Sequence, residues 1–159
     1  MQATTDVVSP RPHGRSQYPP PMALTYYPRV GEILVCHYDA TALGAEMIKS
    51  RPVVVIGPRL RRRADLVGVV PLSTTAPSPE ERYHCKIELD HMLPSPFDNR
   101  VMWAKCDMYG SVSLLRLDRF KEPRARYGGP RKWISGQLSK LQIEAVRKAV
   151  LCGLGLDQS

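Results

Sequence analysis

Short runs of apolar, mostly β-branched residues recur along the chain, and most of the linkers between them carry Gly, Pro, Asp or Asn. Runs of this length and composition are typical of β-strands. The strands predicted in this way, the last weaker than the others, are Ile33–Tyr38, Pro52–Ile56, Leu66–Leu72, His84–Leu89, Val101–Lys105 and Val112–Leu117. A series of short strands joined by turns favours a mainly β fold, either a small antiparallel barrel or a rolled sheet.

A helix is predicted near the C-terminus from its capping signal. Ser139 is followed three residues later by Gln142, the pattern of a capping box, in which each side chain satisfies a backbone N–H group at the helix start. The polar residues after it share a narrow arc, and Gly153 and Gly155 supply a stop. The apolar residues expected to pack against the sheet are Leu141, Ile143, Ala145, Val146, Ala149 and Val150.

The N-terminal residues have a different composition. Residues 1–27 are rich in Pro, Ser, Thr and Gln and show no hydrophobic period, so we expect a disordered Pro-rich tail. Residues 28–159 are expected to form one domain, because a 159-residue chain with 43% hydrophobic residues can bury a single core. No segment resembles a signal peptide or a membrane span, which predicts a cytoplasmic protein without a membrane partner.

Positive charge dominates the chain, with 23 Lys and Arg against 15 Asp and Glu and a formal net charge of +8. This balance favours a polyanionic partner, either nucleic acid or an acidic protein segment. The charge is clustered in the loop 59–63 and in the run 119–133, which interleaves aromatic residues with cations as single-strand binding sites do. The cations assigned to RNA binding are Arg59, Arg61, Arg62, Arg63, Arg124, Arg126 and Lys132. Solubility is the alternative role for both runs.

Cysteine and histidine spacing predicts no metal and no cofactor. The 4 cysteines are widely separated, without a Cys-x-x-Cys pair or a matching histidine spacing. A phosphate-binding loop, a dinucleotide fingerprint and a nucleophile elbow are all missing from the sequence. Of the histidines, only His37 has a place in a strand from which it could face a groove.

Polar side chains stand at the ends of two neighbouring strands. Arg51 directly precedes a buried strand, and Glu46 lies in the polar loop before it. Ser73 and Thr74 follow the next strand along the chain. An arginine and a hydroxyl at neighbouring strand ends can bind a phosphate. The structural alternative is that Arg51 pairs with Glu46 or Asp39 at the barrel rim, while the hydroxyl groups cap a turn.

The order and spacing of these motifs resemble the PemK/MazF family of toxin–antitoxin ribonucleases, in particular its PemK-like branch. The matching pieces, between about Val30 and Leu154, are Gly31-Glu32-Ile33, Asp39, Gly44-Ala45-Glu46, Arg51-Pro52-Val53-Val54-Val55, Val70-Pro71-Leu72-Ser73-Thr74 and the closing helix. The resemblance implies an SH3-like barrel of the PemK/MazF/CcdB type, with about five to seven strands and a C-terminal amphipathic helix.

The resemblance also implies a function. Family members usually form homodimers whose groove binds single-stranded RNA, they cleave it without metal, and an acidic antitoxin tail blocks the groove. By position, Arg51 matches the family's catalytic arginine, Ser73 its catalytic hydroxyl and Glu46 an acidic loop residue associated with activity, with Thr74 in support. The chain is thus expected to be the toxin of a type II toxin–antitoxin system, a sequence-selective endoribonuclease. Attack by the substrate's 2′-hydroxyl would leave a cyclic phosphate.

Two departures from the family pattern accompany this expectation. The loop before Arg51 carries Met47–Ser50 where members commonly have Gly, and Lys105–Asp107 stands where many have an acidic residue and Gln. Two other classes stay open: a catalytically silent nucleic-acid-binding barrel, and a toxin that binds a protein target such as gyrase.

Overall fold

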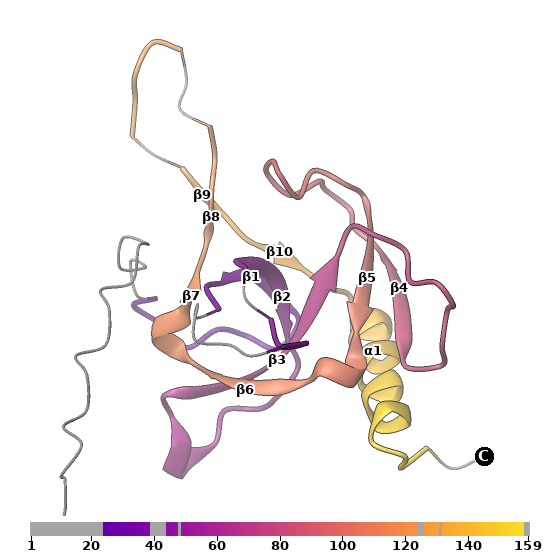
Figure 1. Cartoon of the computed structure of the whole chain (residues 1–159). Helices are drawn as coiled ribbons and strands as arrows, with labels where there is room; N and C mark the ends of the chain where they lie inside the picture. Colours follow the sequence, from indigo (N-terminus) through magenta and orange to yellow (C-terminus); the bar gives the residue numbers. More distant parts are fainter. Residues whose placement is uncertain (1–23, 39–43, 48, 124–125, 131, 158–159) are drawn as a thin grey trace, which may run out of the picture.

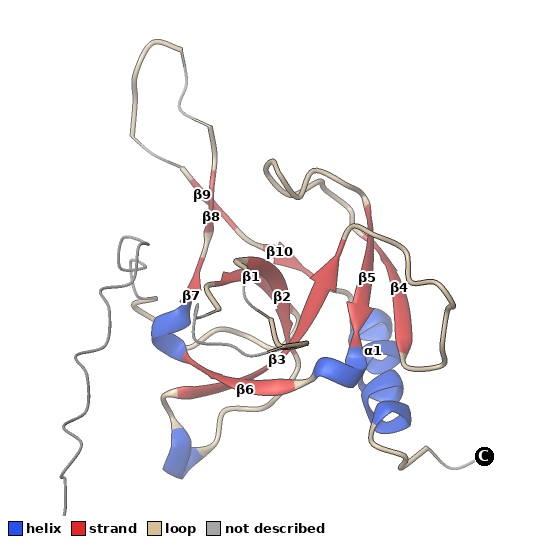
Figure 2. Cartoon of the chain, in the orientation of Figure 1, coloured by secondary structure: helices blue, strands red, loops and turns tan. Residues whose placement is uncertain are grey.

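The computed structural model describes residues 24–38, 44–47, 49–123, 126–130 and 132–157. These residues form a curled antiparallel sheet with a C-terminal α-helix against it, which confirms the mainly β prediction (Figures 1 and 2). The strands are β1 (Glu32–Cys36), β2 (Arg51–Val55), β3 (Leu66–Ser73), β4 (His84–Glu88), β5 (Val101–Lys105), β6 (Gly110–Ser113), β7 (Leu117–Asp118), β8 (Phe120–Lys121), β9 (Trp133–Ile134) and β10 (Gly136–Gln137). The described residues also form the α-helix α1 (Lys140–Gly153). The short 3₁₀ helices are η1 (Arg61–Arg63), η2 (Cys106–Met108) and η3 (Leu114–Arg116).

The strand order of the main sheet is β10-β1-β2-β3-β5-β4, with β6 paired to β3 and β7 paired to β1. The long strand β3 makes the sheet curl, because it pairs with β6 through Leu66–Val69 and with β5 through Leu72–Ser73. Beyond β2 the ladder also carries a bulge, since the N–H groups of Ile56 and Gly57 both donate to the carbonyl of Gly68, at 3.0 and 3.1 Å. The sheet therefore bends into a half-barrel.

The strands β1 to β3 are buried on both faces, as their near-continuous apolar sequence requires. Successive side chains of a strand point to opposite faces. One face joins the helix-side cluster, whose fully buried members from these strands include Ile33, Val54, Val70 and Leu72. The other joins a second cluster, made of Leu24, Leu34, Cys36, Val53, Val55, Val67, Val69 and Leu117. Each fully buried Val or Leu stabilises the fold by about 1.5–3 kcal/mol relative to exposure.

The capping box of α1 is present as predicted. Ser139 Oγ accepts from the Gln142 backbone N–H at 3.2 Å, and the Ser139 N–H donates to Gln142 Oε1 at 2.9 Å. Gln142 also donates through Nε2 to the Glu88 carbonyl at 2.8 Å, while the Arg147 guanidinium donates to the Ile56 carbonyl at 2.8 and 3.2 Å. The cap therefore also holds the start of the helix on the sheet.

The apolar face of α1 is narrower than the sequence indicated. Val146, Ala149 and Val150 are buried and Ile143 packs against the same cluster. Leu141, 78% exposed, and Ala145 face solvent, so their assignment to the sheet was wrong. A helix that lies on a sheet as a single layer buries only a stripe of its surface.

Two boundaries differ from the expected ones. The segment Val112–Leu117 is not one strand: β6 ends at Ser113, whose Oγ accepts from the Leu115 N–H at 3.3 Å and caps η3 before β7 begins. Residues 24–27, placed in the tail by composition, contact the barrel through buried Leu24 and through the Tyr27 hydroxyl, which donates to the Leu66 carbonyl at 3.0 Å. The rest of the expected tail, residues 1–23, lies outside the described residues.

At the two ends of the basic run 119–133, β8 and β9 pair with each other as a separate two-stranded ribbon, which projects away from the curled sheet (Figure 1). We call the described residues of this segment, 119–123, 126–130 and 132–134, the arm. The sequence predicted none of the two-residue strands β8, β9 and β10, because so short a segment carries no periodic signal. Within the part of the chain that the structure describes, no helix is long and apolar enough to span a bilayer.

Candidate functional site

Strand register brings Arg51 and Ser73 together. β2 pairs Val53 with Pro71 in antiparallel register, and continuing this register by two residues places Arg51 opposite Ser73. Ser73 in turn pairs with Trp103 of β5. Side chains of directly opposed residues leave a sheet on the same face. The guanidinium and the hydroxyl, separated by 22 positions in the sequence, therefore occupy one edge of the same face.

Arg51 has a buried hydrogen-bond donor without an acceptor. The side chain is half-buried, and its Nε atom has no hydrogen-bond partner among the described residues. A buried N–H group without an acceptor is costly, and such groups concentrate at functional sites. Among the described residues this donor is therefore open to an anion that approaches this face. Asp39, one partner in the structural alternative, lies outside the described residues.

Ser73 is almost fully buried, at 8% exposure, and its Oγ accepts from the Thr75 backbone N–H at 3.1 Å. This is the turn role expected under the structural alternative, and it is compatible with binding because the hydroxyl proton is still free to donate. Thr74 is exposed just beyond the strand. Ser73 is thus the hydroxyl whose position the fold restrains.

Tyr38 is an aromatic residue near Arg51 that sequence reasoning did not assign. Its pKa is raised, first by burial and then by its interaction with Cys36, while the guanidinium groups of Arg51 and Arg116 act in the opposite direction. Burial also raises the pKa of the Cys36 thiol to about 12, so this cysteine is a neutral core group. Tyr38 therefore lies within electrostatic range of two arginines.

An open cavity of about 630 Å³ adjoins this tyrosine. Its polar lining includes Tyr38, Glu46, Asp107 and Arg116, and Arg116 is held by donating to the His37 carbonyl at 3.2 Å. The remaining lining residues are Met47, Val69, Met108, Tyr109, Gly110, Ser111 and Val112. Tyr38 lines the cavity and interacts electrostatically with Arg51. The cavity therefore lies next to the Arg51–Ser73 pair.

The cavity adds three groups that the sequence did not single out. Tyr38 follows the end of β1 by two residues and Arg116 is the last residue of η3, and no local pattern marks either of them. Asp107 belongs to the Lys105–Asp107 stretch noted as a departure from the family pattern, which was the available signal for it. Glu46 is exposed at the cavity, as its loop position indicated.

His37 is directed to the residue before Arg51. Its Nδ1 lies 2.8 Å from Ser50 Oγ. Burial lowers the pKa of His37, with Lys121 adding to the decrease and Asp118 opposing it. The histidine thus supports the start of β2, and it is not among the residues that line the cavity.

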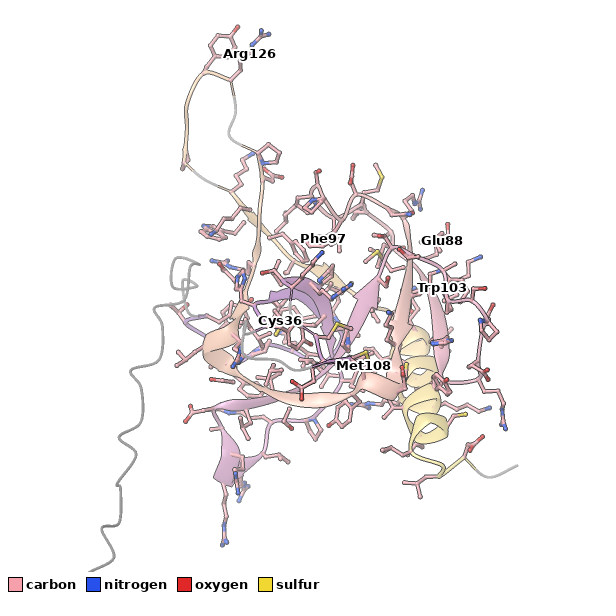
Figure 3. All side chains as sticks on the ribbon, viewed as in Figure 1. Cys36, Glu88, Phe97, Trp103, Met108 and Arg126 are labelled. Carbon is pink, nitrogen blue, oxygen red and sulfur yellow. The ribbon has the colours of Figure 1, made fainter. Side chains whose placement is uncertain are left out.

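The two basic runs lie far apart. Arg59, Arg61, Arg62 and Arg63 are exposed in the loop between β2 and β3, with the Arg59 guanidinium 5.1 Å from the centre of the Tyr27 ring. Arg126 and Lys132 are exposed on the arm, and Figure 3 shows Arg126 at its tip, far from Cys36 in the sheet. Arg124 lies outside the described residues. Among the residues described, no group of three or more His, Cys, Asp or Glu side chains is arranged so that it could hold a metal ion.

Comparisons with known proteins agree with this fold. Residues 29–151 match the family described as PemK-like, MazF-like toxin of type II toxin–antitoxin system. The uncharacterised protein YifN of Escherichia coli K12 is 33% identical over 122 residues, which cover 65% of this chain and 80% of that protein. An uncharacterised protein of Haemophilus influenzae is 34% identical over 101 residues, which cover 57% of this chain and 68% of that protein.

Solved structures show the same architecture at low sequence identity. An endoribonuclease from a mycobacterial species, in complex with its cognate antitoxin, has a TM-score of 0.53 and 16% identity, covering 83% of this chain and 99% of that one. MazF from Deinococcus radiodurans has a TM-score of 0.51 and 18% identity, covering 82% and 98%. These likenesses establish the fold.

Proposed function

The chain belongs to the PemK/MazF family of type II toxin–antitoxin toxins, and we propose that it is a toxin that cleaves single-stranded RNA. The observation that supports this most is the place of Arg51, which faces the restrained hydroxyl of Ser73 when the β2–β3 register is continued. Its buried Nε–H has no hydrogen-bond partner among the described residues. A guanidinium and a hydroxyl on one face form a site for a phosphodiester. The net charge of +8 favours the same polyanionic substrate.

The proposed reaction uses the substrate's own nucleophile. The ribose 2′-oxygen attacks the adjacent phosphorus, the bond from phosphorus to the 5′-oxygen breaks, and the products are a 2′,3′-cyclic phosphate and a 5′-hydroxyl end. The 2′-hydroxyl loses one proton and the leaving oxygen gains one. The protein must therefore supply a proton acceptor and charge stabilisation at the phosphorane, while water supplies the proton that the leaving oxygen takes up.

Arg51 is assigned to the phosphorane. Its planar guanidinium offers N–H donors to the non-bridging oxygens, which carry the most negative charge in the transition state, and it also faces the leaving oxygen. Ser73 donates its hydroxyl proton to the same phosphate, because its acceptor side already holds the Thr75 N–H. The exposed Thr74 next to it supports this contact.

Glu46 is the proposed base. Its carboxylate lies at the cavity that adjoins Tyr38, and the second carboxylate in that cavity is Asp107. A carboxylate can accept the proton of the 2′-hydroxyl when both lie within hydrogen-bond distance in the bound complex. Substitutions Glu46→Gln and Asp107→Asn, compared in the same assay, decide between the two.

Partners follow from the same assignment. We propose that an acidic antitoxin segment competes with RNA for this surface, since both are polyanions, and that the toxin acts as a homodimer in the cytoplasm. An acidic segment bound across the Arg51 face would place carboxylates where the phosphates bind.

The test is incubation of purified protein with single-stranded RNA in EDTA. Cleavage should persist without free metal, the upstream fragment should end in a cyclic phosphate, and the downstream fragment should begin with a 5′-hydroxyl. DNA should bind without being cut, because it lacks the 2′-hydroxyl. Arg51→Ala should lower kcat by about 10²–10³-fold with less effect on binding, and Ser73→Ala should lower it less.

Lys148→Ala, an exposed cation on α1, is the matched control and should cleave like the wild type. RNA that is bound but left intact across many unrelated sequences would instead identify a silent nucleic-acid-binding barrel. Toxicity in cells without RNA cleavage would point to a protein target. Cleavage that requires magnesium, or that survives Arg51→Ala, contradicts the mechanism.

A further inference from the structure

The base of the arm is fixed to the core of the barrel. β8 and β9 pair Phe120 with Ile134 and Lys121 with Trp133. Phe120 is only 3% exposed, and its ring meets the Phe97 ring edge to face at a centroid distance of 6.2 Å. Ile134 packs against the same cluster. The direction in which the arm leaves the barrel is therefore set by buried apolar contacts.

The opposite face of this base presents two ordered cations. Because Phe120 and Ile134 point to the core, their neighbours point outward. The Trp133 ring lies 5.5 Å from Arg119 Cζ and 5.2 Å from Lys121 Nζ, both within range of cation–π attraction. Lys121 Nζ is also 3.7 Å from the buried carboxylate of Asp118. The Trp133 ring therefore lies against both cations and holds them at the base of the arm.

The far part of the arm is exposed and strongly basic. Between positions 119 and 132 the sequence has six Lys and Arg residues and one carboxylate. Arg126 and Lys132 are exposed, and Tyr127 is 95% exposed. Gly128 turns the chain here with a φ of 75°. An aromatic ring so fully exposed among cations is typical of surfaces that bind single-stranded nucleic acid.

The base of the arm lies beside the candidate site. The Lys121 ammonium lowers the pKa of His37 and the Asp118 carboxylate raises it, so both charges are within electrostatic range of that imidazole. The same imidazole contacts Ser50 Oγ at 2.8 Å, and Ser50 directly precedes Arg51. The base of the arm and the start of β2, which carries Arg51, therefore both adjoin His37.

We propose that the arm continues the RNA-binding surface beyond the catalytic site, and that it binds the phosphodiester backbone of nucleotides flanking the cleaved bond. Arg119 and Lys121 contact the nearer phosphates, Arg126 and Lys132 the farther ones, and Tyr127 stacks on a base. This inference rests on the proposed ribonuclease function, since it assumes an RNA strand at Arg51. Lys121 and Tyr127 are six positions apart in the sequence, a separation that spans at most about 20 Å. Only an RNA longer than the site itself can use the arm.

RNA matches the charge and the exposed aromatic ring of the arm better than a second copy of the chain or an acidic protein segment does. A second copy of the chain carries the same net charge of +8, so its approach to the arm is opposed by like charge. An acidic protein segment matches the charge, but it has no stack of bases for the exposed Tyr127 ring.

The experiment measures how tightly a short and a long RNA bind to a variant that does not cleave RNA. Full-length protein with Arg51→Ala is titrated with RNAs of about 6 and about 20 nucleotides, at salt concentrations from about 50 to 200 mM. The arm variant adds R126S and K132S. The matched control instead adds K140S and K148S, two exposed cations of α1, so both variants lose the same charge.

For the long RNA, the arm variant should lower the slope of log affinity against log salt by about 1.4, because each lost phosphate contact on a single strand contributes about 0.7. Its affinity for the short RNA, and both affinities of the control, should stay unchanged. Equal losses for both RNAs, or equal losses in the control, would overturn the proposal, because then only net charge matters. If the arm variant loses binding of polyglutamate but keeps its RNA binding, the arm binds an acidic protein partner and the proposal is overturned. If the arm variant changes its oligomeric state without RNA, the arm contacts a second copy of the chain and the proposal is likewise overturned.

The two hypotheses fail separately. Wild-type protein that binds long RNA through the arm and never cuts it contradicts the ribonuclease and leaves the arm proposal standing. Wild-type protein that cuts both RNAs with the same KM, and whose arm variant does likewise, contradicts the arm proposal and leaves the ribonuclease standing.

Discussion

Replacing Arg51 with methionine separates the catalytic role of this residue from a structural one, because the two roles predict opposite changes in stability. Methionine keeps most of the volume of the arginine stem and removes the guanidinium. In the folded protein, the buried Nε–H of Arg51 has no acceptor among the described residues. A rim salt bridge would make the guanidinium stabilising, whereas a group held ready for an absent phosphate is destabilising.

The size of the effect follows from that single donor. A buried donor without an acceptor costs about 1–3 kcal/mol, and the half-exposed position of Arg51 places its cost in the lower part of this range. Arg51→Met should therefore raise the free energy of unfolding by about 1–2 kcal/mol. For a chain of this length, that corresponds to an increase in Tm of about 3–6 °C. RNA cleavage should fall by at least about 10²-fold at the same time.

The assay combines urea and thermal unfolding with RNA cleavage on the same preparations. Arg82→Met is the matched control, because the Arg82 guanidinium pairs with Asp157 at 2.6 Å and its side chain is 73% exposed. The Asp157 side chain is only 18% exposed, so removal of its partner should lower stability, the opposite of the change expected for Arg51→Met, and should leave cleavage unchanged. If Arg51→Met lowers Tm by several degrees, the guanidinium has a structural partner and the reasoning from its unpartnered donor is refuted. Unchanged cleavage would refute the catalytic role.

Two further predictions concern charge. Burial lowers the pKa of His37 below its usual value of 6.5, so the unfolded chain binds a proton there more readily and stability should be lost as pH falls through 6.5 towards the lowered pKa. Urea unfolding between about pH 7.5 and 5 should therefore show a steeper loss in the wild type than in His37→Gln, and parallel profiles would contradict this. If the 61–63 loop contacts phosphates, replacing its three arginines with Ala should lower the salt slope of RNA binding by about 2. An unchanged slope would remove that loop from the RNA-binding surface.

The sequence alone determined the elements whose signals are local. The β-branched runs became β2 and β3, because such residues fit a sheet covered on both faces. The capping box formed between Ser139 and Gln142, since it requires only residues three positions apart. The family pattern likewise depends on order and spacing, which can be read without coordinates.

The sequence predicted less well those features that depend on a neighbouring secondary-structure element. The two-residue strands β8 and β9 exist because they pair with each other, and no period can show in so short a run. The exposure of Leu141 was decided by how α1 lies on the sheet, which the amphipathic pattern of the helix does not specify.

The arrangement of the candidate site was decided by tertiary structure. Sequence reasoning placed Arg51 and Ser73 at the ends of neighbouring strands, but only the register of β2 and β3, continued by two residues, puts them opposite each other on one face. The cavity beside them is lined by Tyr38, Asp107 and Arg116, which come from separate segments of the chain. The physical reason is the same in each case: local propensity depends on adjacent residues, whereas sheet register and curl depend on long-range pairing, and these long-range contacts determine which polar groups meet.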